Sequence, residues 1–172
     1  ENGWRVGVVA QSHAVVENML ERVVAAGVPK EQVAKAPKDA TGAEQPFTVI
    51  PKNGIAAFVE ERNGAGFVVG GTAWDFTHEG RVPRGSLDLL VIDEAGQFSI
   101  ASTIAVSLAT QRLLLLGDPQ QLPQVSQGLH PEPVDTSALG WILGDADVIP
   151  AAYGFFLAES RRMHPAVAGP VS

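Results

Sequence analysis

Two adjacent carboxylates, Asp93 and Glu94, stand directly after an apolar run of branched residues from Leu89 to Ile92. Such a run is typical of a strand that is buried on both faces of a parallel sheet. Ligands of open α/β sheets bind beyond the carboxyl ends of the strands, which is where both acids fall. One carboxylate there can hold Mg²⁺ beside phosphate oxygens, while its neighbour orients or deprotonates a water. The alternative is that the two acids are solvated at a strand end or cap a helix.

A second apolar run, Arg112 to Leu116, breaks into a loop rich in Gly, Pro and polar residues. Gln121 in this loop carries both a donor and an acceptor, so it can touch a terminal phosphate and a water together. A helical pattern from Phe98 to about Thr110 separates the two runs, as in a β-α-β unit. Because a right-handed crossover joins such strands, we expect both loops at the same edge of the sheet.

The remaining elements follow from apolar spacing and from breaker residues. A strand is expected from about Trp4 to Ala10, and Ser12 is placed to cap the helix after it. Residues 28–53 carry four prolines, four lysines and no sustained hydrophobic period, so they predict an irregular insertion in which Phe47–Ile50 is at best a short strand. The other expectations are a helix from Asn53 to Arg62, a strand at Phe67–Val69, an exposed loop at 74–86, a short helix ending at Leu143 and a short strand at Phe155–Leu157.

Composition fits one globular α/β domain of 172 residues in which 45% of the residues are hydrophobic. The chain has no cysteine, which excludes disulfides and thiolate metal sites and favours a cytoplasmic protein. No apolar stretch approaches the roughly 20 residues that a membrane span needs, so no membrane partner is expected. The formal net charge of −7 argues against strong nucleic-acid binding by this chain alone.

The motifs and their order resemble those of superfamily 1 nucleic-acid helicases. Asp93–Gly96 resembles the Walker B motif, and Gly117–Leu122 resembles the sensor motif that follows it. Val6–Val16 and Val68–Trp74 resemble two strand-to-loop motifs on the nucleic-acid side of these enzymes. Ser160–Pro165 resembles the Q-Y-R-M-H-P element of the branch that contains the nonsense-mediated-decay helicase, although Ser and Arg replace the first two residues. The likeness is closest to bacterial fusions of a RecB-like nuclease with such a helicase.

The resemblance implies a RecA-like P-loop fold that uses ATP and Mg²⁺. Asp93 would hold the Mg²⁺ and Glu94 would activate the attacking water. Gly117 and Asp118 would line the nucleotide. Gln121 would sense the γ-phosphate, and Arg162 would reach the terminal phosphate and stabilise the charge that develops there.

The resemblance also implies contacts with a single strand of nucleic acid, with DNA favoured over RNA. Ser12, His13 and Thr72 would make these contacts. Ser12 and Thr72 fit simple helix caps equally well, and the two roles are compatible.

The phosphate-binding sequence G-x-x-x-x-G-K-[ST] does not occur in the 172 residues. We therefore expect a piece of one motor domain, with a second motor domain and a nuclease domain as candidate partners. The alternatives are a degenerate homologue and a non-catalytic module that binds nucleic acid or protein. In the family, the phosphate-loop strand pairs with the sensor-motif strand, so the sheet would be incomplete at Arg112–Leu116. Either Phe155–Leu157 would replace the missing strand, or two copies would associate across this edge.

Overall fold

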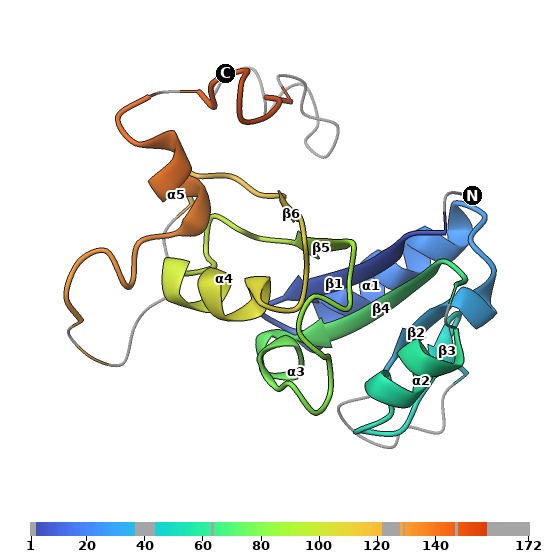
Figure 1. The fold of residues 1–172 in the computed structure, drawn as a ribbon. Coiled ribbons are helices and arrows are strands. Elements are labelled where there is room, and N and C mark those ends of the chain that lie inside the picture. The colour runs from blue at the N-terminus through green and yellow to red at the C-terminus, as the bar shows by residue number, and fades with distance from the viewer. Residues whose placement is uncertain are drawn as a thin grey trace. The chain divides into compact units, whose positions relative to one another are not determined.

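The computed structural model describes residues 3–36, 44–62, 64–121, 128, 130–146 and 148–157. The chain divides into two compact units, Glu1–Trp141 and Ile142–Ser172. In the first unit, six strands form one sheet in the order β3-β2-β4-β1-β5-β6, and all of its strand pairs are parallel (Figure 1). The strands are β1 (Arg5–Ala10), β2 (Val33–Lys35), β3 (Thr48–Val49), β4 (Phe67–Thr72), β5 (Leu89–Ile92) and β6 (Leu113–Leu115). The helices are α1 (His13–Ala25), the 3-10 turn η1 (Lys30–Gln32), α2 (Ile55–Glu61), α3 (Ala73–Thr77), α4 (Ile100–Ser107) and α5 (Ala138–Leu143).

The parallel register brings the carboxyl ends of the central strands into one row. Val9 near the end of β1 lies opposite Gly71 of β4 and Ile92 of β5. Ile92 in turn lies opposite Leu115 of β6. The loops that follow these strands therefore emerge side by side at one edge of the sheet, as the β-α-β pattern predicts.

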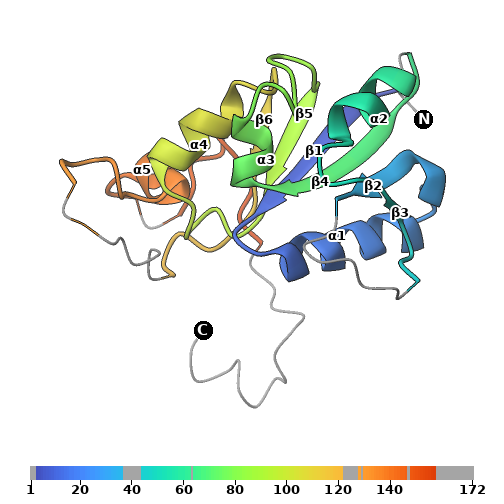
Figure 2. The same ribbon diagram turned by 90° about the horizontal axis from the view of Figure 1, so that it is seen from below.

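Helices cover both faces of the sheet, with α1 on one face and α2 and α3 on the other (Figure 2). Successive residues of a strand point to opposite faces, so Val8 belongs to the core beneath α1 and Val9 to the core on the other face. Val16 and Leu20 of α1 are fully buried against the first face. Each such side chain contributes about 1.5–3 kcal/mol by leaving water.

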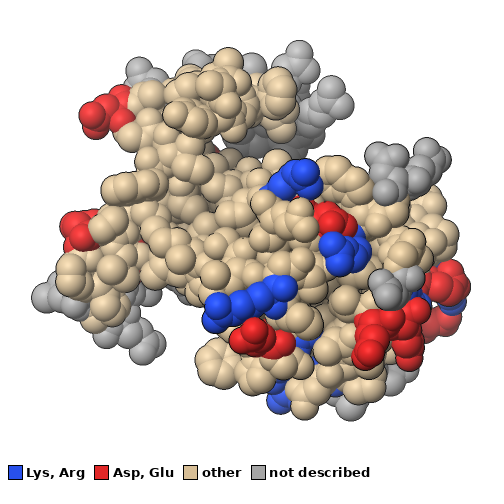
Figure 3. All heavy atoms as spheres, in the orientation of Figure 1, with Lys and Arg blue, Asp and Glu red and all other residues tan. Residues whose placement is uncertain are grey.

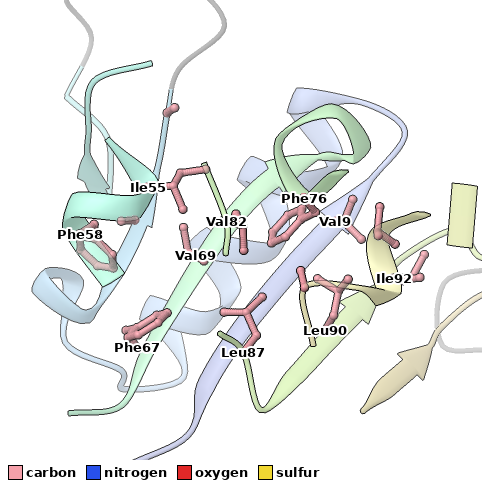
Figure 4. Close-up of a cluster of buried hydrophobic side chains, with 14 of the residues drawn as sticks. Val9, Ile55, Phe58, Phe67, Val69, Phe76, Val82, Leu87, Leu90 and Ile92 are labelled. Atoms are coloured by element: carbon pink, nitrogen blue, oxygen red, sulfur yellow. The ribbon is translucent and has the colours of Figure 1, made fainter. Parts of the chain in front are cut away.

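The core on the second face is the larger of the two hydrophobic clusters, and Figure 4 shows it. Phe58 of α2 packs edge-on against Phe67 of β4, with ring centroids 5.8 Å apart. Phe76 of α3 and Leu90 of β5 are buried in the same cluster. This core fixes the strands and helices from which the loops at the carboxyl edge begin.

Three expectations from sequence differ from the structure. Part of the insertion expected to be irregular forms β2, because Val33–Lys35 is buried and pairs with β4. The strand β3 lies within Phe47–Ile50, the short strand that the sequence allowed there. Three residues are too few to show a hydrophobic period, so periodicity does not reveal β2. The loop expected at 74–86 begins with α3. The prediction of a strand at Phe155–Leu157 was wrong, since these residues form no strand.

The edge strand β6 pairs only with β5 among the described residues. Replacement of a missing neighbour by Phe155–Leu157 is therefore not found. Leu113 and Leu114 remain exposed, at 39% and 44% of their surface. In the described part of the chain, no helix has the length and apolar character needed to cross a membrane.

Candidate functional site

The first loop of the candidate site begins where β5 ends. The backbone N–H of Asp93 donates to the carbonyl of Val9 at 2.9 Å, which extends the β1–β5 ladder to the first acid. The Asp93 carboxylate accepts the N–H of Glu94 at 3.0 Å. Both acids are half-buried. Their position beyond the carboxyl end of a central strand agrees with the expectation from sequence.

Glu94 adopts a left-handed backbone conformation, with φ of 56°. It is the only non-glycine residue with positive φ in the described part of the chain. For a residue with a side chain this conformation costs about 1–2 kcal/mol. The surrounding contacts hold it: Ala95 N–H donates to Leu116 O at 2.8 Å, and Gln97 N–H donates to Glu94 O at 2.8 Å. Strain of this kind concentrates at functional sites.

The second loop, Gly117 to Gln121, lies against the first. A Cβ on Gly96 would collide with the carbonyl oxygen of Asp118, and one on Gly117 would come within 2.8 Å of Ala95 N. Only glycine at both positions lets the two backbones approach this closely. The close approach brings Asp93, Glu94, Gly117, Asp118 and Gln121 into one pair of touching loops.

A side-chain bond also joins the loops, from Gln97 Nε2 to Gln121 Oε1 at 3.0 Å. The Gln121 carbonyl is therefore an acceptor for Gln97, and its NH₂ group remains a donor suited to an anionic oxygen. Asp118 Oδ1 accepts the N–H of Gln120 at 2.9 Å and so shapes the exposed second loop. Sequence reasoning missed Gln97. It could have been found because a polar side chain three residues after Glu94 belongs to the same turn as the two acids.

Ser12 and His13 follow β1 at the same edge. Ser12 Oγ accepts the N–H of Val15 at 3.3 Å and caps α1, as expected. His13 Nδ1 lies 3.0 Å from Nζ of Lys35. Sequence reasoning missed Lys35, which stands at the end of β2 with 1% of its surface exposed. Its signal was a lone charge within the apolar stretch Val33–Ala36.

Thr72 ends β4 and begins α3. Its backbone N–H and its hydroxyl both donate to Asp75 Oδ2, at 2.9 and 3.0 Å. Arg81 Nη1 donates to the other carboxylate oxygen of Asp75 at 2.7 Å. Because the Thr72 hydroxyl proton is engaged, this oxygen offers a ligand only lone pairs, which suit a donor and not a phosphate. Thr72 is the N-cap of α3, which is one of the two roles expected for it, and its contact with nucleic acid stays a prediction.

The oxygen ligands at this edge fit Mg²⁺. Asp93 and Glu94 supply hard carboxylate oxygens, the ligand type that Mg²⁺ prefers. No group of three or more His, Cys, Asp or Glu among the described residues forms a complete metal cage. Mg²⁺ beside a nucleotide needs no such cage, because one or two carboxylates, phosphate oxygens and water complete its coordination. Arg162 lies outside the described residues, so its predicted role stays a prediction.

Charged side chains are scattered on the face of the molecule in Figure 3. Toward the centre of this face, blue and red groups lie next to one another, red groups at the left stand alone, and no continuous basic surface is visible. The Arg5–Asp88 and Arg81–Asp75 ion pairs neutralise two of the arginines. The lack of a continuous basic surface on this face agrees with the net charge of −7 of the whole chain.

A family model described as an AAA domain matches residues 79–127. This range contains β5, α4, β6 and both loops of the candidate site. None of the curated proteins searched matches the chain. The parallel sheet flanked by helices is the α/β architecture of a RecA-like P-loop NTPase domain, which confirms the fold expected from sequence. The match supports a superfamily 1 helicase-like domain.

Proposed function

We propose that this chain belongs to an ATP-dependent motor that moves along single-stranded nucleic acid. The proposed motor is a helicase or nuclease-helicase of the nonsense-mediated-decay-helicase-like branch. The observation that carries the proposal is the close contact of the two loops at Gly96 and Asp118, which gathers two carboxylates and an amide at one sheet edge. The family match over 79–127 supports a P-loop NTPase reading of the same segment.

The proposed reaction transfers the terminal phosphoryl group of ATP to water, giving ADP and inorganic phosphate. Asp93 would hold Mg²⁺, which when bound neutralises charge on the phosphate oxygens. Glu94 would accept a proton from the attacking water. The NH₂ group of Gln121 would donate to an oxygen of the γ-phosphate, and its carbonyl would transmit the state of that phosphate to Gln97.

Two parts of the proposed machinery are not in the described structure. Arg162 would supply a fixed positive charge that forks onto two phosphoryl oxygens. The phosphate loop and its lysine, absent from these 172 residues, would come from the rest of the intact protein. We therefore expect the chain by itself to hydrolyse no ATP and to bind it weakly.

The proposal is tested with an intact protein that carries this chain together with a phosphate loop. Arg162→Ala should lower nucleic-acid-stimulated ATP turnover by about 10³-fold, as loss of an arginine finger does, with little change in nucleic-acid affinity. Arg161→Ala is the matched control, because it removes the same charge one position earlier. Equal, small effects of less than about threefold from both variants would be far below that range and would remove Arg162 from the mechanism.

The second candidate function is a non-catalytic module that kept the fold and binds nucleic acid or protein. The missing phosphate loop favours it, and the net charge of −7 favours a protein over a nucleic acid as the partner of such a module. An intact protein that binds a partner but never turns over ATP, with or without nucleic acid, would support the module and exclude the motor.

A further inference from the structure

Trp74 exposes 69% of its surface, although the two residues that follow it in α3, Asp75 and Phe76, are buried. Figure 1 shows α3 directly after the end of β4. Trp74 therefore stands at the carboxyl edge of the sheet, where the loops after β1 and β5 also emerge. Exposure of one apolar side chain is ordinary in a folded protein. What distinguishes Trp74 is its place at this edge and the way in which its backbone is held.

Hydrogen bonds fix the backbone on both sides of Trp74. Asp75 Oδ2 accepts the backbone N–H and the hydroxyl of Thr72, and Asp75 Oδ1 accepts Arg81 Nη1 at 2.7 Å. The hydroxyl of Thr77 donates to the carbonyl of Trp74 at 3.2 Å. The backbone that carries the indole ring is thus ordered before any ligand arrives. A flat ligand that stacks on the ring loses little free energy in ordering it.

Charge and polarity favour a base of nucleic acid as the ligand of this ring. The net charge of −7 limits what contacts with phosphates can contribute to binding. Stacking of a base on an aromatic ring needs no positive charge. The exposed residues that follow in the chain, Thr77, His78 and Glu79, are polar. The buried centre of a protein–protein interface is instead depleted of charged residues, so this stretch suits a nucleobase better than an apolar protein surface.

We propose that Trp74 is a stacking platform for one base of a single strand of nucleic acid. The platform rests on the proposed function, because the strand is the one along which the motor would move. Every base has a π face, so stacking holds a strand without reading its sequence. This property suits a motor that must pass over any sequence. The platform would add a contact with a base to the contacts expected from Ser12, His13 and Thr72.

The test compares two ligands of an intact protein that carries this chain. The ligands are labelled oligothymidylate and a labelled abasic oligonucleotide of the same length, and fluorescence anisotropy measures their affinities. The abasic strand keeps the phosphates and sugars but has no base to stack. Trp74→Ala should weaken the binding of oligothymidylate about fivefold to 100-fold, the range for loss of one stacking ring. It should leave the affinity for the abasic strand unchanged.

Three further variants control this comparison. Trp74→Phe keeps an aromatic ring and should retain most of the affinity for oligothymidylate. Trp74→Leu keeps an apolar side chain without a ring, and it replaces Trp74→Ala if that variant does not fold. Trp141→Ala removes a tryptophan of α5 that is 60% exposed, and its affinities should match those of the wild type.

The fluorescence of Trp74 gives a second readout. The emission of Trp74 is the difference between the spectra of the wild type and of Trp74→Phe. Unlabelled oligothymidylate should quench this difference, because a stacked base quenches indole emission, and the abasic strand should not. Quenching by both strands to the same extent would contradict stacking on a base.

The outcomes separate the platform from the proposed function. Equal losses of affinity for both strands in Trp74→Ala would indicate a structural role and overturn the platform. Unchanged affinities in Trp74→Ala, with ATP turnover still stimulated by nucleic acid, would overturn the platform and leave the proposed function standing. If the free energy of unfolding falls as well, another part of the intact protein covers Trp74. A wild-type protein that binds neither strand would overturn both the platform and the nucleic-acid part of the proposed function.

Discussion

The carbonyl oxygen of Asp118 occupies the space into which a side chain on Gly96 would extend. This contact joins the loop after β5 to the loop after β6 at the carboxyl edge of the sheet. The bond between Gln97 and Gln121 lies beside it. We therefore expect that a displacement of one loop moves the other.

Gly96→Ala should force the two loops apart. Because the obstructing atom belongs to the backbone, it cannot rotate away, and we expect a loss of about 2 kcal/mol in the free energy of unfolding. Gly128→Ala is the control, since a Cβ there would meet nothing closer than 3.7 Å. Chemical denaturation measures both variants. Equal stability of the two would show that the loops do not touch as described.

Glu94→Gly should be more stable than Glu94→Ala. Both variants remove the carboxylate, but only glycine adopts a φ of 56° without cost. We expect a difference of about 1 kcal/mol in the free energy of unfolding. If Glu94→Ala proves equal or more stable, the left-handed conformation of this residue in solution is excluded.

The ion pair between Arg5 and Asp88 should make stability depend on pH at acid pH. Hydrogen bonds from the Arg5 side chain and backbone lower the pKa of Asp88 from 3.8 to about 2. A carboxylate with a lowered pKa in the folded state stabilises the fold above its unfolded pKa, and this contribution is lost as pH falls from about 4 to about 2.

The Asp88 side chain is 23% exposed, so solvent screening reduces the contribution to roughly 1 kcal/mol. The difference in unfolding free energy between the wild type and Asp88→Asn should therefore shrink between pH 4 and pH 2, by about that amount. Glu60→Gln, at an exposed position on α2, is the control. A difference that stays constant over this range would contradict the pKa shift.

The exposed edge of β6 should promote self-association of the chain. An apolar edge strand pairs readily with another chain, because pairing satisfies its backbone groups and buries its side chains together. Leu114→Lys should lower the weight-average mass in sedimentation at high concentration. Ile104→Lys on α4 places the same charge on an exposed isoleucine away from the sheet edge. A wild-type chain that stays monomeric would rule out association across β6.

Long apolar runs made two neighbouring strands of the sheet and the loops of the candidate site predictable. The runs at 89–92 and 112–116 end in polar loops, so β5, β6 and the residues after them were found by sequence alone. The sequence predicted that the two loops lie at the same edge of the sheet, but it did not predict that they touch. The close approach at Gly96 depends on tertiary packing, which a single glycine in a turn does not reveal.

Short elements and buried polar groups escaped sequence reasoning. The strand β2 has only three residues. Lysine is a residue type that usually lies at the surface, but Lys35 of β2 is buried. Its burial depends on Glu17 and His13, which are 18 and 22 positions away in sequence. At Phe155–Leu157 the sequence predicted a strand that does not form. High β-propensity makes no strand where the segment has no partner to pair with.

The central claim, that the loops after β5 and β6 form an ATP-hydrolysing site, is tested most directly by one comparison. Nucleic-acid-stimulated ATP turnover is measured for an intact protein that carries this chain, as the wild type, Glu94→Gln and the control Glu60→Gln. Glu94→Gln keeps the size of the side chain but removes the base, so turnover should fall by about 10² or more while Mg²⁺–ATP still binds. Glu60→Gln should match the wild type. Wild-type turnover in Glu94→Gln, or no turnover in any of the three proteins, would contradict the claim.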